Sequence, residues 1–236
     1  MSGYPRGKAM KRIVFTVAGM ILFIGILSGI LIVLSNITRP LSTVITSTEC
    51  DPPCWYGIWP GETTSWGATS ILLSLEGVSS IDEGTRDFEL NRITWKFHRP
   101  LGDAFGSTHI KDDRVISISL TTVGSLTISD TFQRLGEPEL VLTRVYKSTS
   151  RKWVKMILIY PADGYQVEAD INLPFGTQDN QVEITTDTPI YRVIYFDPSQ
   201  YEYLIDRRVL INGLGKTAID DARPWQGFGR ITYEMR

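Results

Sequence analysis

The chain contains two cysteines, Cys50 and Cys54, and three residues separate them. Thiols at this spacing can form a redox pair, supply half of a metal site, or close a small disulfide loop. The surrounding segment from Glu49 to Thr64, ECDPPCWYGIWPGETT, also carries three prolines and two tryptophans. Which chemistry applies depends on the compartment that the cysteines occupy and on the elements that hold them.

A long apolar segment near the N-terminus predicts a membrane anchor. Ile13 to Leu34 is a run of 22 residues without a charge, and at about 1.5 Å per residue such a helix spans a hydrocarbon core of roughly 30 Å. The run exceeds the ~7–15 apolar residues of a cleaved signal peptide, so we expect the anchor to be retained. Basic residues precede it and only Arg39 follows closely, which predicts a cytoplasmic N-terminus by the positive-inside rule. The preceding basic residues are Arg6, Lys8, Lys11 and Arg12.

The predicted topology divides the chain into four parts. Residues 1–12 are a basic cytoplasmic tail, 13–34 a transmembrane helix, 35–49 a stalk rich in Ser and Thr, and 50–236 an extracytoplasmic domain. After Asn36 the chain has 20 basic and 26 acidic residues, a formal net charge of −6. Nucleic acid requires clustered Lys and Arg, so we expect no nucleic-acid partner. The sequence therefore predicts a single-pass protein of the plasma membrane, with the membrane itself as one partner.

The extracytoplasmic domain shows a helix followed by strands twice. Thr63 or Thr64 is predicted to cap the first helix, and Thr127 or Ser129 the second. Each helix has an apolar face, which consists of Ala68, Ile71, Leu72 and Leu75 in the first and of Ile128, Phe132 and Leu135 in the second. The two sub-repeats would be residues 50–123 and 124–236.

Alternation of apolar and polar residues predicts antiparallel strands after each helix. In the run around Ile116 and Ile118, for example, Ser117 and Ser119 are expected to face solvent. The predicted strands are Asn91–His98, Val115–Leu120, Leu140–Tyr146, Trp153–Tyr160, Tyr165–Ala169 and Ile190–Phe196, and a short helix is predicted over Ser199–Asp206. We therefore expect an α+β fold, in which a single transmembrane helix precedes short helices packed on an antiparallel β-sheet.

Several motifs resemble those of a known group of proteins. The motif P-C-W-x-G-I-x-P-G-E-T-T ends at Thr64, L-T-I-S-D begins at Leu126, and Y-P-x-x-G-Y-x-V-E begins at Tyr160. Together they resemble a family of uncharacterised bacterial membrane-anchored proteins and lipoproteins. The pattern is also similar to small outer-membrane-assembly lipoproteins and β-lactamase-inhibitor-like domains, which place helices on an antiparallel sheet and bind proteins. These resemblances imply a binding role and supply no catalytic residues.

The predicted compartment favours a disulfide between Cys50 and Cys54, because neighbouring thiols outside the cytosol tend to oxidise. Such a clip would fix how the stalk enters the domain. The alternative is a thiol redox or copper-handling protein that uses the same cysteines, with His98 or His109 as a further copper ligand. His109 is expected in a loop. The spacing of a zinc site is absent, so we expect no metal and no cofactor.

Aromatic residues near the first helix are candidates for ligand contact. Trp55, Tyr56 and Trp59, together with Trp66, would form a platform on which a sugar ring stacks. The competing interpretation is that large aromatics beside a helix start belong to the core. The chain has no nucleophile elbow, and two histidines leave little for triad chemistry, so we expect no catalytic residues. The sequence predicts a non-enzymatic binding or envelope-associated module, whose partner is another envelope protein or a surface ligand.

Overall fold

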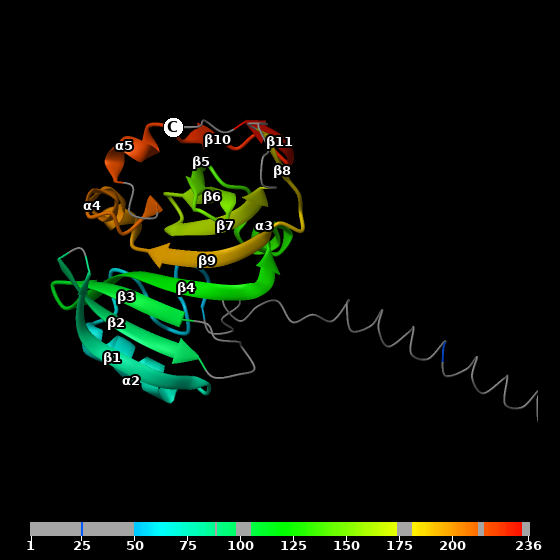
Figure 1. The fold of residues 1–236 in the computed structure, drawn as a ribbon. Coiled ribbons are helices and arrows are strands. Elements are labelled where there is room, and N and C mark those ends of the chain that lie inside the picture. The colour runs from blue at the N-terminus through cyan, green and yellow to red at the C-terminus, as the bar shows by residue number, and fades with distance from the viewer. Residues whose placement is uncertain are drawn as a thin grey trace, which may run out of the picture. The chain divides into compact units, whose positions relative to one another are not determined.

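The computed structural model (Figure 1) describes Gly25 and residues 50–87, 89–97, 105–173, 181–211 and 215–232. The predicted cytoplasmic tail, transmembrane helix and stalk lie outside these residues, apart from Gly25, which is helical. None of the helices in the described ranges combines the length and the apolar character that a membrane span needs. Leu41 to Arg236 form one compact unit, to which the following description applies.

Each half of this unit contains one longer helix and contributes four strands to a large sheet, to which a short C-terminal strand is added as the ninth. The first half comprises α2 (Ser65–Ser74), β1 (Val78–Asp87), β2 (Leu90–Phe97), β3 (Phe105–Lys111) and β4 (Arg114–Thr127). The second half comprises α3 (Ile128–Leu135), β5 (Leu140–Lys147), β6 (Lys152–Tyr160), β7 (Tyr165–Leu173) and β9 (Pro189–Phe196). β4 and β9 pair antiparallel, with Ser117 opposite Phe196, so the two halves share one continuous sheet.

Shorter elements complete the C-terminal part. They are β8 (Gln181–Ile184), η1 (Pro198–Gln200), α4 (Tyr201–Asp206), α5 (Lys216–Ile219), β10 (Arg223–Pro224) and β11 (Gly229–Thr232). β10 pairs with β5 at the end of the large sheet, and β11 pairs with β8 in a separate sheet of two strands. The predicted helix over Ser199–Asp206 corresponds to η1 and α4.

The fold is mostly antiparallel β-sheet, so the predicted α+β class of short helices packed on a sheet is wrong. The large sheet has nine strands in the order β1-β2-β3-β4-β9-β7-β6-β5-β10, whereas the longest helix among the described residues has ten residues. The difference arises because two segments that lack a clear apolar–polar alternation, 78–87 and 105–111, form the strands β1 and β3.

Both predicted helix starts are confirmed. The Thr64 hydroxyl accepts a hydrogen bond from the Gly67 N–H at 3.1 Å. At α3 the Thr127 hydroxyl accepts from the Asp130 N–H at 3.3 Å, and the Asp130 carboxylate accepts from the Thr127 N–H at 2.9 Å. This capping box satisfies two backbone groups that the helix itself leaves unpaired. Gly136, with φ of +76°, ends α3.

Apolar clusters cover both faces of the large sheet. Because side chains of a strand alternate between faces, Met156 and Leu158 of β6 join one cluster and Ile157 joins the other. The first cluster includes the predicted helix faces, with Ala68 and Leu72 fully buried. The second is closed by residues of and after α4, which are Leu204, Ile205, Val209, Leu210 and Ile211. The central strands therefore have no open face.

This double coverage makes two local predictions wrong. Ser117 of β4 is 0% exposed and Ser119 is half-buried, although both are predicted to face solvent. His109 is predicted in a loop, but it lies within β3 and is buried. A central strand that is covered on both faces buries polar and apolar positions alike, so alternation there does not indicate exposure.

Candidate functional site

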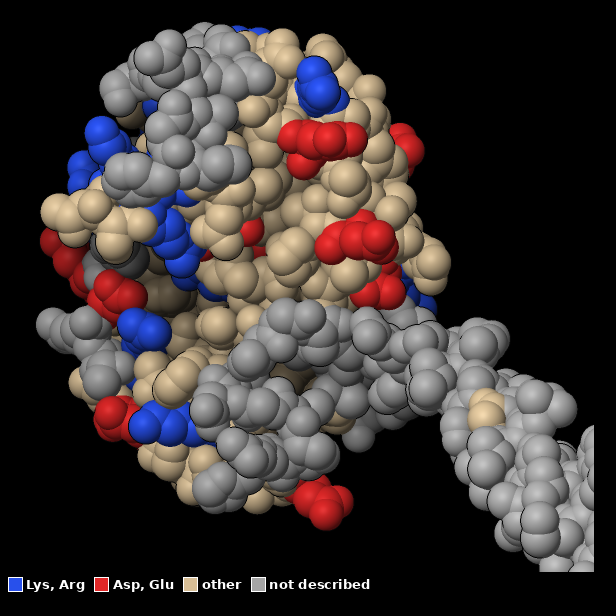
Figure 2. Space-filling model, turned by 45° about the vertical axis from the view of Figure 1, so that its right-hand side comes forward, with Lys and Arg blue, Asp and Glu red and all other residues tan. Residues whose placement is uncertain are grey.

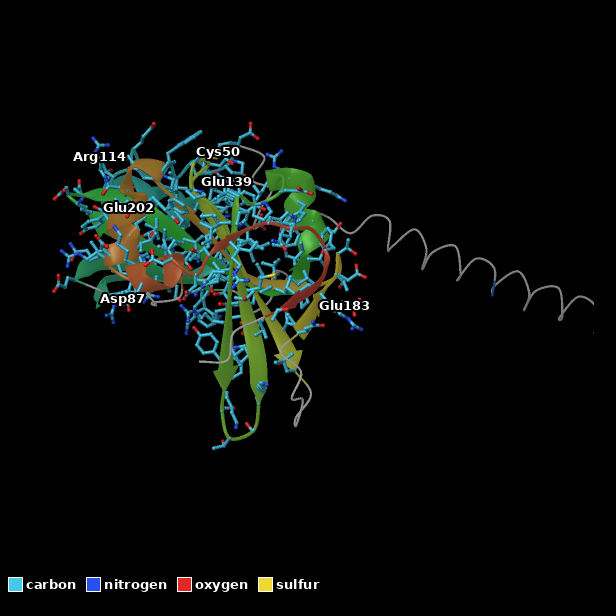
Figure 3. The ribbon with its side chains drawn as sticks, turned by 90° about the horizontal axis from the view of Figure 1, so that it is seen from above. Cys50, Asp87, Arg114, Glu139, Glu183 and Glu202 are labelled. Atoms are coloured by element: carbon cyan, nitrogen blue, oxygen red, sulfur yellow. A yellow bond between two sulfur atoms is a disulfide. The ribbon has the colours of Figure 1, made fainter. Side chains whose placement is uncertain are left out.

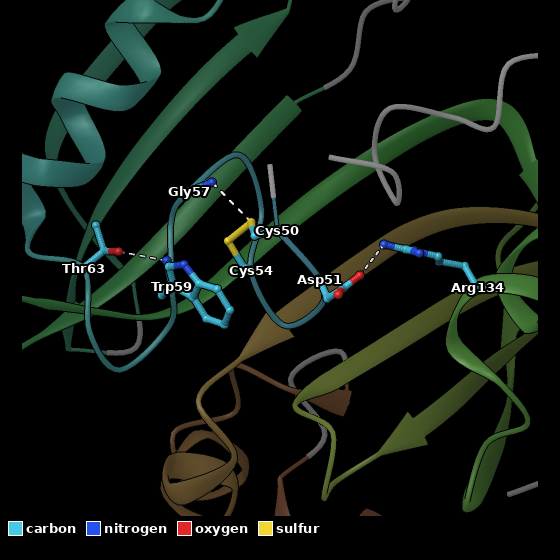
Figure 4. Close-up of a disulfide and its surroundings, with 7 residues drawn as sticks. All are labelled: Cys50, Asp51, Cys54, Gly57, Trp59, Thr63 and Arg134. Carbon is cyan, nitrogen blue, oxygen red and sulfur yellow. Dashed lines mark hydrogen bonds and ion pairs between the residues drawn. A yellow bond between two sulfur atoms is a disulfide. The ribbon is translucent and has the colours of Figure 1, made fainter. Parts of the chain in front are cut away.

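Cys50 and Cys54 form a disulfide, which confirms the predicted bond between them (Figure 4). Their Cα atoms are 5.7 Å apart, within the usual range of about 4.4–6.8 Å. The Cys54 N–H donates to the Asp51 carbonyl oxygen at 3.1 Å, and the Gly57 N–H donates to the Cys50 sulfur at 3.4 Å. The two sulfurs are therefore part of a folded loop.

Polar contacts tie this loop to the rest of the domain. The guanidinium of Arg134, on α3, donates to the Asp51 carboxylate at 2.7 Å (Figure 4). The Trp59 N–H donates to the Thr63 hydroxyl at 2.8 Å, and the Thr63 N–H donates to the Trp59 carbonyl oxygen at 2.9 Å. The second pair of bonds shapes the turn that leads into α2. The segment thus joins α2 of the first half to α3 of the second.

The three predicted ligand-facing aromatics differ in exposure. Trp55 is 2% exposed and stacks on Trp95 of β2, with ring centroids 5.6 Å apart. Gly106 of β3 makes room for this stack, because a Cβ atom there would lie 2.0 Å from the Trp95 ring. The ring of Trp55 therefore packs in the core and does not face a ligand. Tyr56 is half-buried, and Trp59 is 39% exposed.

A cleft beside Trp66 is the strongest candidate for a binding site. Trp66 lies in the first turn of α2 and is 76% exposed. It borders a cleft of about 410 Å³ between α2 and strands of the first half, which is within the ~300–1,000 Å³ typical of small-molecule sites. The polar lining residues are Ser65, Thr69, Glu83, Asn91, Arg92 and Asp113. A wide aromatic surface thus adjoins carboxylate, amide, hydroxyl and guanidinium groups.

Hydrogen bonds hold the polar lining of this cleft in place. The Glu83 carboxylate accepts from the Thr69 hydroxyl at 2.5 Å, and the Asp113 carboxylate accepts from the Ser65 hydroxyl. Each carboxylate has lone pairs beyond the one used in this way, which leaves capacity for a ligand. Both bonds connect α2 to the sheet side of the cleft, so the two walls are fixed before a ligand binds.

Asp87, His109 and Ser117 form a row with the residue types of a hydrolase triad. His109 Nδ1 lies 3.0 Å from the Ser117 hydroxyl oxygen, and Nε2 lies 3.7 Å from an Asp87 oxygen. Burial lowers the pKa of His109 to about 4, although the Asp87 charge raises it. Ser117 is enclosed, and β3 and β9 both pair with β4 at this residue. A substrate cannot reach Ser117, and the paired backbone there offers no free N–H groups to stabilise an oxyanion. The three residues therefore form a buried polar contact and not a catalytic triad.

A second buried polar cluster joins β6, β7 and β9. The carboxylate of Glu168, which is fully enclosed, accepts from the Arg192 guanidinium at 2.7 Å and lies 3.7 Å from Lys155 Nζ. Lys155 also contacts Asp170 at 3.1 Å. The charges of Glu168 and Lys155, both buried, are thus compensated by neighbouring side chains of the same sheet. We therefore assign this cluster a structural role.

A metal site is not assembled in the described part of the chain, where no group of three or more His, Cys, Asp or Glu side chains could hold an ion. His98 lies outside the described residues. His109 contacts Ser117 and Asp87, and the sulfurs of Cys50 and Cys54 bond to each other. The thiolates that a copper or redox role requires are thus engaged in the disulfide.

The sequence points to Trp66 but gives no indication of its polar neighbours. Glu83 belongs to β1 and Arg92 to β2, and Asp113 lies in the turn between β3 and β4. Sheet pairing alone brings these separate segments together. Of these residues, only Asp113, with φ of +62°, lies at a turn that the sequence could have indicated.

Comparison with protein-family models and with curated proteins gives no match. Among solved structures, the chain is similar to a cysteine-rich secretory protein from Staphylococcus aureus, with 11% sequence identity and a TM-score of 0.29. The similarity covers 64% of this chain and 47% of that one, so this chain matches about half the length of the secretory protein. At this TM-score the similarity carries no conclusion about fold or function.

Proposed function

We propose that the chain is a single-pass, membrane-anchored protein that displays residues 50–236 outside the cytoplasm and binds a ligand there without catalysis. The disulfide between Cys50 and Cys54 supports this compartment, because cytosolic reductants keep such pairs open. The uncharged run from Ile13 to Leu34, with its basic flank, supports an uncleaved anchor and a cytoplasmic N-terminus.

The cleft beside Trp66 is the proposed binding site, and the exposure of this indole is the observation that carries the proposal. A saccharide presents apolar C–H faces, which stack on an indole, and hydroxyls, which bind carboxylate, amide and guanidinium groups. Glu83, Asn91, Arg92 and Asp113 supply these groups around the same cleft. A sugar of the cell envelope is therefore the ligand class that this lining fits best, in keeping with the proposed location.

Two exposed tryptophans provide a matched test. Full-length protein in detergent is titrated with a panel of neutral and N-acetylated mono- and disaccharides, and binding is followed by calorimetry. We expect Trp66→Ala to weaken binding by at least about tenfold, equivalent to roughly 1.4 kcal/mol, because the stacking surface is lost. Trp59→Ala removes an exposed indole that does not line the cleft and should leave affinity unchanged. Absence of saccharide binding, or equal loss in both variants, would overturn the proposal.

A further inference from the structure

Among the strands that the structure describes, β5 has a neighbour along only a short part of one of its edges. β6 pairs with all eight residues of β5 on one side. On the other side β10 pairs only with Val141 and Leu140, and among the described strands no other adds to this edge. The Ser148 N–H donates to the Arg151 carbonyl oxygen at 2.7 Å, so these two residues form a hydrogen-bonded pair at the end of the hairpin. Every second residue of β5 before Ser148 therefore bonds to β6, and the residues between them do not. By that alternation Thr143, Val145 and Lys147 direct their backbone N–H and C=O groups away from β6.

The opposite edge of the same sheet, β1, is built differently. Its pairing with β2 is interrupted by register shifts between Val78 and Ser80 and between Glu83 and Thr85. Bulges, glycines such as Gly84 with φ of +91°, and charged residues are devices that prevent an edge from accepting another strand. β5 pairs with β6 in an unbroken register and contains no proline. Of the two edge strands, β5 is therefore the one whose regular pairing geometry suits the addition of another strand.

Cavities lie beside this edge of β5, where β10 leaves the strand. One of about 210 Å³ and one of about 170 Å³ share Val141, Thr143, Arg223 and Thr232 in their linings. Trp225 adds an aromatic wall to the first. An added strand directs side chains to alternate sides of its backbone, so these cavities provide space for side chains next to the β5 edge.

The charge around β5 indicates what kind of strand would bind. Residues 140–162 contain five basic residues and no acid. Lys155 is buried against Glu168 and Asp170, and Arg144 pairs with Asp221, so the basic character lies at the hairpin turn, with Lys147, Arg151 and Lys152. On the face shown in Figure 2, Lys and Arg side chains lie mostly on the left of the view, where Asp and Glu side chains also occur. The β5–β6 hairpin projects beyond the rest of the unit in Figure 3, which leaves it accessible. Lys147 is exposed, and Arg151 keeps half of its side chain exposed despite its contact with Asp170.

We propose that the edge of β5 opposite β6 binds an extended, acidic segment of a partner protein by strand addition. Backbone hydrogen bonds to Thr143, Val145 and Lys147 would supply affinity, and the basic hairpin would select acidic side chains. A second copy of this chain is a poorer occupant, because β5 itself contains no acidic side chain that could complement the basic hairpin. This surface shares no lining residue with the Trp66 cleft, so the proposed strand-binding edge and the proposed saccharide site can be tested independently.

The test uses full-length protein in detergent and two fluorescein-labelled heptapeptides, one alternating Val with Glu and the other alternating Val with Lys. Fluorescence polarisation should show saturable binding of the Glu peptide and much weaker binding of the Lys peptide. Val145→Pro removes one outward N–H without removing a bond to β6, and proline is tolerated on edge strands. We expect this variant to weaken binding about tenfold, whereas Val145→Thr, which keeps the N–H, should bind as wild type.

Lys147→Glu provides a second variant that leaves the backbone intact. It should weaken binding of the Glu peptide about threefold, since an exposed ion pair contributes less than 1 kcal/mol. The proposal is overturned if the Glu peptide fails to bind at about 1 mM, if both peptides bind equally, or if Val145→Pro binds as wild type. Sedimentation showing a dimer that Val145→Pro abolishes would also overturn it, in favour of self-association.

Discussion

His109 contacts Ser117 through Nδ1 and faces Asp87 through Nε2, in a part of the sheet that is covered on both sides. Burial disfavours the charged imidazolium and lowers the pKa of His109 to about 4, while the nearby Asp87 charge opposes this shift and Arg92 reinforces it. The ring is therefore neutral at neutral pH, and protonating it would place a charge inside the sheet. At the scale of the residue, stability depends on keeping this imidazole uncharged.

This environment predicts a pH dependence of stability. Because the pKa of His109 is lower in the folded state than its ordinary value of 6.5, the unfolded chain binds the proton first as the pH falls. The contribution of neutral His109 to the free energy of unfolding is therefore fully present above pH 6.5 and is lost between pH 6.5 and about 4. The loss is on the order of 3 kcal/mol at most. Urea unfolding at about pH 7 and pH 5 should show a smaller pH effect for His109→Gln, and an equal effect would contradict this assignment.

At the scale of the element, α2 is held by one face. Leu72 is fully buried in the cluster beneath the helix, whereas its neighbour Leu73 is 71% exposed. The Thr64 cap and the spacing of Ala68 and Leu72 explain both the start of the helix and its orientation. Local residues therefore determine this element.

Adjacent leucines give a matched pair of variants for this helix. Leu72→Ala removes buried methyl groups and leaves a cavity, so we expect unfolding free energy to fall by about 2–5 kcal/mol. Leu73→Ala makes the same chemical change at a solvent-facing position and should alter stability by less than about 0.5 kcal/mol. Thermal unfolding monitored by circular dichroism distinguishes the two. Similar losses in both variants would mean that the helix packs through a different face.

The elements that could be predicted from sequence are those that short-range patterns determine. Caps such as Thr64 and Thr127 lie within four residues of the groups they bind, so the sequence alone reveals them. β3 escapes prediction because Gly106 and the polar residues after it are typical of a loop. Gly106 is required there for another reason: the Trp95 ring of the neighbouring strand occupies the space of its Cβ. Such a requirement depends on sheet pairing, which a linear pattern does not contain.

At the scale of the whole molecule, burial and site geometry depend on segments far apart in the chain. Ser117 is buried because β3 and β9 flank it within the sheet and the segment around α4 covers the face to which its partner Phe196 belongs. The alternation of β4 gives no indication of this. The Trp66 cleft likewise combines residues from α2, β1, β2 and the turn after β3. Sequence patterns identify the disulfide and one cleft aromatic, and the fold supplies the other cleft residues.

The central claim is that a disulfide-closed domain is displayed outside the cytoplasm, and the two cysteines allow one measurement to test it. Full-length protein in intact spheroplasts is treated with a membrane-impermeant maleimide, with or without an impermeant reductant, and its mass is then determined. We expect no labelling without reductant and labelling of the half-buried Cys50 after reduction. Labelling without reductant would show free thiols, and labelling that requires cell lysis would place the domain in the cytoplasm; either result would contradict the account.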